Sequence, residues 1–215
     1  MRSAKSIELT CPNCDYRFTS ASVDESSIKG RRRTDFHVHA EGKPLAFGVH
    51  VCDRCGFAGR EDGFAQASVS YDVQRHVWDE LAPRICEAQL TSSEKYEFAA
   101  KVAVWNGATD REIGDLWLRA AWCCVEEDDV EAERYYRLRA ASHFEKCLTE
   151  FDGPLPGERP ALTYLVGELW RRIGDTERAT QWFQRVADEV GTCREDRWFL
   201  HWAKQQRIEP REWFE

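Results

Sequence analysis

The chain has 215 residues, of which 42% are hydrophobic, 12% aromatic and 32% charged, and its formal net charge is −8. This composition is too hydrophobic for a disordered chain and too charged for a membrane protein, so we expect a globular protein of one large or two small domains. No uncharged stretch approaches the ~18 apolar residues that a membrane-spanning helix needs, and the first residues contain no secretory signal. The sequence therefore predicts a cytoplasmic location without membrane contact.

A cytoplasmic location bears on the nine cysteines of the chain. Thiols stay reduced in that compartment, and an odd number of cysteines also argues against a disulfide framework. Metal binding and core packing are therefore the roles that we expect for these residues.

Composition changes near residue 80. The first 80 residues carry a net charge of −1 and the remaining 135 carry −7, and eight of the nine tryptophans lie in the later part. Short runs at 36–39 and 47–51 alternate or nearly alternate apolar and polar residues, as half-buried strands do. We expect a small zinc-ribbon-like β module over residues 1–75 and a helical domain over residues 76–215, which makes the fold α+β and mostly α.

The β module contains two Cys-x-x-Cys pairs, separated by 37 residues: Cys11, Cys14, Cys52 and Cys55. Each pair can form a tight turn, and two such turns complete a tetrahedral Cys₄ site for Zn²⁺. The residue after such a turn often needs a positive φ, which Gly56 adopts freely and Asp15 tolerates. Four thiolates leave no position for a water molecule, so the Zn²⁺ would be structural and would stabilise a module too small to build its own core.

Other interpretations of these cysteines remain. A single Cys-x-x-Cys can be a redox motif, but that function favours a βαβ context and leaves the second pair unexplained. The four residues could also be buried cysteines with no shared role. Three histidines between the pairs, His37, His39 and His50, could replace a ligand, but strand alternation is expected to place them on the hairpin surface.

The β module also contains the clearest basic cluster of the chain: Lys29, Arg31, Arg32 and Arg33. Many zinc ribbons bind nucleic acid, and phosphate binding requires several correctly placed cations. The net charge of −8, which a Zn²⁺ bound by four thiolates lowers by a further two, argues against this function. Nucleic-acid binding is therefore the alternative hypothesis.

The later part of the chain predicts one helix after another, because apolar residues recur at the spacing i, i+3, i+4, i+7. Capping-box patterns begin at Thr91, Thr109 and Thr192. Pro160 suits a first helical turn, and Gly174 can end a helix. The expected helices span roughly 75–89, 93–106, 110–126, 130–150, 159–173 and 176–190, with a seventh near 195–206.

Further candidate residues lie in the helical part. Free cysteines on apolar stripes usually pack as small hydrophobic residues, which is the role expected for Cys86, Cys123, Cys124, Cys147 and Cys193. The acidic run at 126–129 is expected to be a solvated turn between two helices and not a cation site. Glu168 is expected to pair with Arg171 or Arg172, although a cleft of carboxylates around it would instead indicate an enzyme.

Several motifs form a specific combination over most of the chain: Cys11-Pro12-Asn13-Cys14, Thr34-Asp35-Phe36, 42–45, 49–58, 62–64, 120–123 and 162–175. Together they resemble the bacterial DUF2225 family. That family has no assigned activity, so the resemblance implies an architecture, a zinc-ribbon-like module followed by tetratricopeptide-like helices, and no reaction.

Residues 162–190 also resemble a tetratricopeptide repeat. Gly167 falls where such repeats have a small residue, with Ala179 twelve residues later and Phe183 four beyond that. A small residue at the crossing lets two antiparallel helices approach closely. Residues 113–148 resemble a degenerate copy, in which Trp117 is in register and the second helix is offset by about one residue at Ala132.

No nucleotide-binding loop, zinc-protease motif or nucleophile elbow is present, so we expect no catalytic residues and no cofactor besides Zn²⁺. The main hypothesis is a non-enzymatic zinc-binding protein whose helical repeats act as a scaffold or adaptor for a protein or peptide partner. The alternative is a nucleic-acid-binding regulator that acts through the zinc module and its arginines. Four aromatic residues could contact the partner or pack back onto the helices: Trp198, Trp202, Trp213 and Phe214.

Overall fold

The computed structural model describes residues 4–23, 29–65, 68–87, 89–149, 153–154, 157–190 and 194–214. Within these residues, small β-hairpins with a cluster of four cysteines precede helices that pack pairwise, so the fold is mostly α, as predicted. The capping box predicted at Thr192 and the side chain of Cys193 lie outside the described part of the chain.

The described N-terminal part contains three antiparallel hairpins of two strands each. The first hairpin has six residue pairs, whereas the other two have two pairs each. Two short 3₁₀ helices, η2 (Pro44–Phe47) and η3 (Glu61–Ala65), accompany them. The strands are β1 (Lys5–Thr10), β2 (Arg17–Ser22), β3 (Arg31–Arg32), β4 (Val38–His39), β5 (His50–Val51) and β6 (Ala58–Gly59).

Helices make up most of the remaining chain. The elements are α1 (Tyr71–His76), the π-helical turn η4 (Val77–Leu81), α2 (Ala82–Glu87), α3 (Ser92–Trp105), α4 (Asp110–Glu127), α5 (Val130–Thr149), α6 (Arg159–Ile173), α7 (Thr176–Glu189) and α8 (Arg194–Ile208). None of the described helices is both long enough and apolar enough to cross a membrane.

The seven predicted helices are all found in the described residues, and six of them begin and end within two residues of the expected positions. The first was expected at 75–89 and instead runs over 71–87, as α1, η4 and α2. Pro83 has no backbone N–H to donate to the preceding turn, which accounts for the π-helical turn just before it.

Helix ends follow the signals predicted from the sequence. Thr91 and Thr109 both form complete capping boxes with the glutamates three residues later. Pro160 lies in the first turn of α6, and Gly174 ends that helix in the left-handed conformation, with a φ of 93°. The side chain of Asp175 then caps α7.

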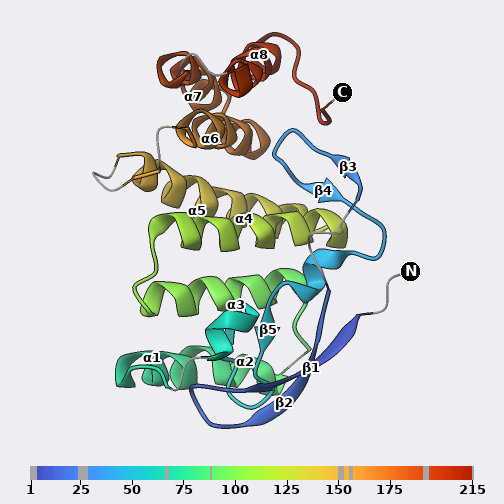
Figure 1. Ribbon diagram of the computed structural model, residues 1–215, viewed down its shortest axis with the longest axis vertical. Coiled ribbons are helices and arrows are strands. Elements are labelled where there is room, and N and C mark those ends of the chain that lie inside the picture. Colours follow the sequence, from blue (N-terminus) through green and yellow to red (C-terminus); the bar gives the residue numbers. More distant parts are fainter. Residues whose placement is uncertain are drawn as a thin grey trace.

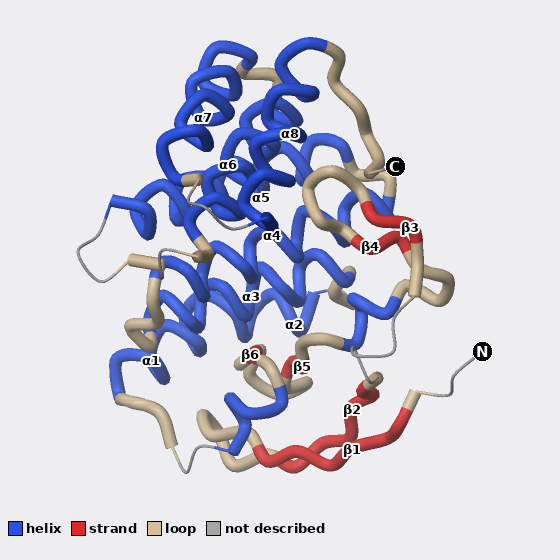
Figure 2. The backbone as a smooth tube through the Cα atoms, turned by 45° about the horizontal axis from the view of Figure 1, so that its top comes forward, coloured by secondary structure: helices blue, strands red, loops and turns tan. Residues whose placement is uncertain are grey.

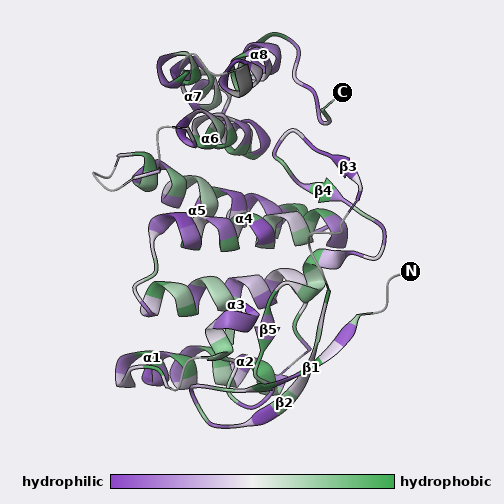
Figure 3. Ribbon diagram, viewed as in Figure 1, coloured by the Kyte–Doolittle hydropathy of each residue, from purple (hydrophilic) through white to green (hydrophobic). Residues whose placement is uncertain are grey.

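The helices form a stack that runs from α1 and α2 at one end to α7 and α8 at the other (Figure 1). Within it, α4 packs on α5 and α6 on α7. Each of these helices carries both hydrophobic and hydrophilic residues, as amphipathic helices with one apolar and one polar face do (Figure 3). The β1–β2 hairpin lies at the α1–α2 end, whereas the β3–β4 hairpin lies further along, beside the C-terminal residues (Figure 2).

One hydrophobic cluster joins the β module to the helices. It includes Phe57 and Phe64 of the β module together with Tyr96 of α3 and Trp117 of α4, all of them buried. The hydroxyl of Tyr96 donates a hydrogen bond of 3.0 Å to the carbonyl oxygen of Leu45. The boundary predicted at residue 75 falls within α1, and the parts on either side of it share this core.

Two glycines let the helix pairs approach closely. A Cβ on Gly167 of α6 would lie 2.6 Å from Phe183 of α7, and one on Gly114 of α4 would lie 2.6 Å from Phe144 of α5. Both distances are too short for a methyl group against a packed ring. The expectation of a close approach at Gly167 is therefore confirmed, and α4 and α5 approach closely in the same way at Gly114.

Candidate metal centre

The two Cys-x-x-Cys pairs lie in the turns of two hairpins, one between β1 and β2 and one between β5 and β6. Both turns have the same backbone pattern. The N–H of the first cysteine donates to the carbonyl five residues later, and its carbonyl accepts from the N–H four residues later, all at 2.9 Å. Asp15 and Gly56 have φ values of 58° and 80°, which confirms the conformation predicted for them.

The two turns bring together the predicted ligands, Cys11, Cys14, Cys52 and Cys55. All four Sγ atoms lie within 4.8 Å of one another. Cys11 Sγ lies 3.6 Å from Cys55 Sγ, and Cys14 Sγ lies 3.7 Å from Cys52 Sγ. Tetrahedral Zn–S bonds of about 2.3 Å would place the sulfur atoms about 3.8 Å apart, so the four thiols fit a single ion such as Zn²⁺.

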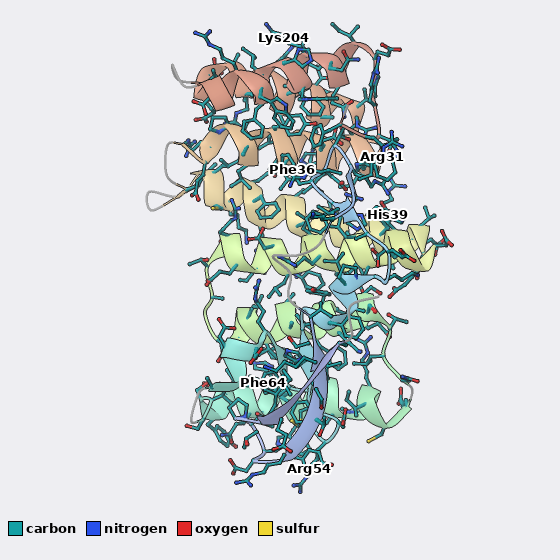
Figure 4. The ribbon with its side chains drawn as sticks, turned by 45° about the vertical axis from the view of Figure 1, so that its right-hand side comes forward. Arg31, Phe36, His39, Arg54, Phe64 and Lys204 are labelled. Carbon is teal, nitrogen blue, oxygen red and sulfur yellow. The ribbon has the colours of Figure 1, made fainter. Side chains whose placement is uncertain are left out.

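Contacts within the cluster change the pKa values of Cys11 and Cys52. Hydrogen bonds with Cys52 and Cys55, together with burial, raise the pKa of the Cys11 thiol. Hydrogen bonds from Cys11 and Cys55 lower the pKa of Cys52 to about 2. Four thiolates at this spacing would repel one another, whereas a divalent cation at their centre favours the deprotonated form of every ligand. The cluster has the donor set of a closed structural metal site, at the end of the molecule marked by Arg54 in Figure 4.

The prediction that His37, His39 and His50 lie on the hairpin surface is wrong for two of them. His37 and His50 are almost fully buried, and His39 is exposed. His50 Nδ1 lies 2.9 Å from Ser20 Oγ, and burial lowers the pKa of His50. Strand alternation fails here because His37 lies in the turn before β4 and not in a strand, and because β5, which contains His50, is only two residues long. Among the described residues, the group that could hold a metal ion consists of the four cysteines and includes no histidine.

The described cysteines of the helical part follow the prediction of core packing with one exception. Cys123, Cys124 and Cys147 are buried, whereas Cys86 is exposed. Burial raises the pKa of Cys124 to about 12, so this thiol stays protonated at neutral pH.

The acidic run at 126–129 is only partly the solvated turn that the sequence predicts. Asp128 ends α4 with a φ of 59°, and both it and Asp129 are exposed. Glu126 and Glu127 still belong to α4, and Glu127 accepts a hydrogen bond of 2.6 Å from Ser93 Oγ. The side chain of Glu126 is 5% exposed, so half of the run is committed to contacts within the protein.

A second group of candidate residues lies at the turn of the β3–β4 hairpin, residues 34–37, which we call the docked turn. Its Asp35 is completely buried. Asp35 Oδ2 lies 2.8 Å from Arg137 Nη1 of α5 and 3.5 Å from Arg172 Nε of α6. Burial alone would raise the pKa of Asp35, but the charges of Arg172 and Arg137 outweigh burial and hold this pKa well below its ordinary value. The ionised carboxylate thus joins the hairpin to two helices.

Hydrogen bonds extend this contact to α6 and the C-terminal residues. Glu168 pairs with Arg171 and Arg172, as predicted, at 3.0 and 3.2 Å. Its Oε2 also accepts a hydrogen bond of 2.9 Å from the Thr34 hydroxyl, which in turn accepts one of 3.0 Å from Arg172. Glu212 lies 3.1 Å from Arg171 and 2.7 Å from Arg172. These carboxylates pair with the arginines of α6.

Phe36 occupies an aromatic cluster next to this network. Its ring centre lies 5.7 Å from that of Tyr164 in α6, 6.2 Å from Phe199 in α8 and 5.8 Å from Phe214. Its backbone has a φ of 70°, in the left-handed region. Figure 4 shows Phe36 beside the upper helices, far from Phe64 in the metal-binding part.

His37 completes the docked turn against α4. Its ring stacks on Trp122 with ring centres 5.4 Å apart, and its Nε2 lies 3.4 Å from Glu126 Oε1. Neither ring nitrogen has a directed hydrogen-bond partner among the described residues. The docked turn therefore contacts four helices through four consecutive side chains.

The arginines of the basic cluster differ in their contacts with the C-terminal residues. Arg33 pairs with Glu212 at 3.1 Å and forms an isolated backbone bridge with Trp213. The guanidinium carbon of Arg31 lies 4.6 Å from the centre of the Trp213 ring, and Arg31 and Arg32 remain exposed. Arg33 is thus part of the fold, and the other two arginines face solvent.

Sequence analysis overlooked the roles of Asp35 and Arg137. Arg137 precedes Ala140 by three residues and Phe144 by seven, which places it on the apolar stripe of α5. A charged residue on such a stripe is rarely buried without a partner. The position of Arg137 therefore indicates that a buried acidic partner exists, but it does not indicate which residue of the chain that partner is.

Two Cys-x-x-Cys turns at hairpin ends, joined to a stack of helices, define a protein with a module of four clustered cysteines, a candidate metal site, and a helical part. The family described as "Uncharacterized protein conserved in bacteria (DUF2225)" matches residues 4–209. The chain belongs to this family, in agreement with its motifs. Comparison with curated proteins and with solved structures finds no match.

We expect the purified chain to hold one equivalent of zinc and the Cys52→Ser variant to lose it. The variant removes one thiolate of four, and metal binding contributes directly to folding in modules of this size. Elemental analysis measures the metal, and thermal unfolding should show a lower midpoint for the variant. Cys86→Ser is the matched control, since Cys86 is exposed and outside the cluster. Less than about half an equivalent of zinc in the wild type would contradict the assignment.

Asp35→Asn should lower the free energy of unfolding by about 1.5–3 kcal/mol at pH 7, because it removes the buried carboxylate that Arg137 and Arg172 share. Arg137 keeps its pair with Glu133, and Arg172 keeps its pairs with Glu168 and Glu212. The folded-state pKa of Asp35 lies below the unfolded value of about 3.9. Its stabilising contribution is therefore present above about pH 4 and is lost as the pH falls through the folded-state pKa.

Denaturant unfolding between about pH 7 and pH 2 tests this contribution. The wild type should lose stability on acidification, and Asp35→Asn should show a shallower dependence on pH. Asp72→Asn removes an exposed carboxylate and serves as the control. Equal stability of Asp35→Asn and the wild type at pH 7 would show that the buried pair contributes nothing.

Proposed function

We propose that this protein is a non-enzymatic adaptor whose helical stack binds a protein partner and whose four cysteines hold a structural Zn²⁺. The observation that carries this proposal is the docked turn. The helices already bind an irregular chain segment through its side chains, with Asp35 between two arginines and Phe36 among aromatic rings. Recognition of this kind, by charge and by ring packing, is what peptide-binding helical proteins use.

Of the four aromatic residues that the sequence suggests for partner contact, fewer are available on the surface. Trp202 is buried, and Phe214 packs against Phe36, so both belong to the fold. Trp213 lies beneath Arg31. Trp198 keeps 39% of its surface exposed at the edge of this cluster and is the residue of the four best placed to touch a partner.

Affinity capture tests the adaptor proposal. The full zinc-loaded chain, used as bait in an extract of its source bacterium, should retain a protein that mass spectrometry identifies and that binds again when both are purified. Nuclease treatment should leave the capture unchanged, and Trp198→Ala should weaken the purified complex, whereas His201→Ala on the exposed side of α8 should not. Capture that disappears after nuclease treatment, or no reconstituted complex, would contradict the adaptor function.

The second candidate function is nucleic-acid binding by the exposed part of the basic cluster. The observation that favours it is that Arg31 and Arg32 are both exposed and that Arg31 lies over the ring of Trp213. Arginines and aromatic rings together bind single-stranded nucleic acid through phosphate contacts and stacking.

Fluorescence anisotropy with a single-stranded oligonucleotide tests this function. If the protein binds nucleic acid here, Arg31→Ala/Arg32→Ala should weaken binding and reduce its salt dependence. Without these two cations, fewer counterions are released from the phosphates on binding. Arg33 is left unchanged because its pair with Glu212 is part of the fold. Lys204→Ala/Arg207→Ala removes two exposed cations of α8 and is the control. Equal affinities of the two double variants for the oligonucleotide would show that the surface at β3 does not bind it.

A further inference from the structure

The docked turn is attached to the helices more than to its own hairpin. The hairpin around it has only two residue pairs, Arg31 with His39 and Arg32 with Val38. By contrast, the side chains of residues 34–37 contact α4, α5, α6 and α8. This segment therefore sits on the helices as a bound peptide would, although it belongs to the same chain.

Binding in this position has visible costs. Phe36 has a φ of 70°, a conformation that side chains other than glycine adopt rarely. The neighbouring His37 is 1% exposed, yet neither of its ring nitrogens makes a directed hydrogen bond among the described residues. A strained backbone and an unsatisfied buried side chain at adjacent positions are more typical of a segment that moves than of a settled core.

Release of the turn would also return its charges to water. Asp35, Arg137 and Arg172 are desolvated in the docked state. The cost of desolvation largely cancels the attraction within a buried ion pair, so opening exposes charges that water stabilises well. Opening of this kind differs from a substitution at Asp35, which removes one charge and leaves the other two buried.

The surface that the turn covers has a definite chemistry. Arg137 and Arg172 form a site for one carboxylate, and Tyr164, Phe199 and Phe214 surround one aromatic ring. The carboxylate and the ring come from consecutive residues, Asp35 and Phe36. A segment from another protein would fit the same surface if it presented an acidic residue followed by an aromatic one in a turn.

We propose that the docked turn is a releasable internal ligand, and that the surface beneath it binds a partner segment that carries an Asp–aromatic turn. The proposal rests on the adaptor function and specifies the part of the partner that is recognised. The partner segment competes with residues 34–37 for Arg137 and Arg172 and for the aromatic cluster.

Hydrogen exchange of the wild-type, zinc-loaded chain tests whether the turn opens. The N–H of Arg33 donates to His37, that of Phe36 to Arg33, and that of Thr34 to Glu212. These amides should exchange at least about 100-fold faster than the amides of Val166 and Leu169 in the buried α6, because local opening requires less free energy than global unfolding. Equal protection in the turn and in α6 would overturn the proposal.

A synthetic peptide of residues 30–40 tests the surface itself, with binding followed by calorimetry. Phe36→Ala in the full chain weakens the internal ligand, so this variant should bind the peptide at least about tenfold more tightly than the wild type does. Thr34→Ala, which removes hydrogen bonds but no charge or ring, should act in the same direction and replaces Phe36→Ala if circular dichroism shows that variant to be unfolded. A control peptide with Ala in place of Asp35 and Phe36 should not bind.

Three outcomes would overturn the assignment: no gain in peptide affinity in either variant, equal binding of the control peptide, or dimers of the variants that form without peptide, because a second copy would then supply the turn. The adaptor proposal can fail separately. A captured partner whose binding does not change in Phe36→Ala would support the adaptor function and contradict the internal ligand. If no partner is captured but the peptide binds as expected, the internal ligand is supported and the adaptor function is contradicted.

Discussion

The arrangement of this protein depends on one carboxylate, that of Asp35, which has no contact with solvent. An ionised carboxylate remains in such a position only when cations surround it, and here Arg137 of α5 and Arg172 of α6 do so. In the docked state this carboxylate therefore joins the β3–β4 hairpin to both helices. Glu168 and Glu212 also pair with Arg172, so the C-terminal residues take part in the same contact.

A metal ion at the four cysteines would restrain the hairpin before this contact forms. The docked turn lies in the loop between Cys14 and Cys52, and a metal ion held by both Cys-x-x-Cys turns would close that loop. Closing a loop reduces the conformational entropy that its residues lose on docking. We infer that the four cysteines serve the helical surface as well as their own module, although none of them touches the docked turn in the described contacts.

Much of this structure is local and could be predicted. Helix boundaries follow from apolar spacing and caps such as Thr91 and Thr109, and the metal cluster follows from the spacing of the cysteines. The docked turn could not be predicted, because Thr34 and Glu168 are 134 residues apart and neither has a local motif that names the other. The error at His37 has the same origin, since this residue lies in the turn and is buried by its contact with Trp122 of α4.

The central claim is that Asp35 and Arg137 stabilise the fold through each other. A double-mutant cycle with Asp35→Asn and Arg137→Met measures this directly, from the free energies of unfolding of the wild type, the two single variants and the double variant. The double variant should lose about 2 kcal/mol less than the sum of the single losses, because both single substitutions break the same buried ion pair of 2.8 Å. Losses that add within about 0.5 kcal/mol would contradict it.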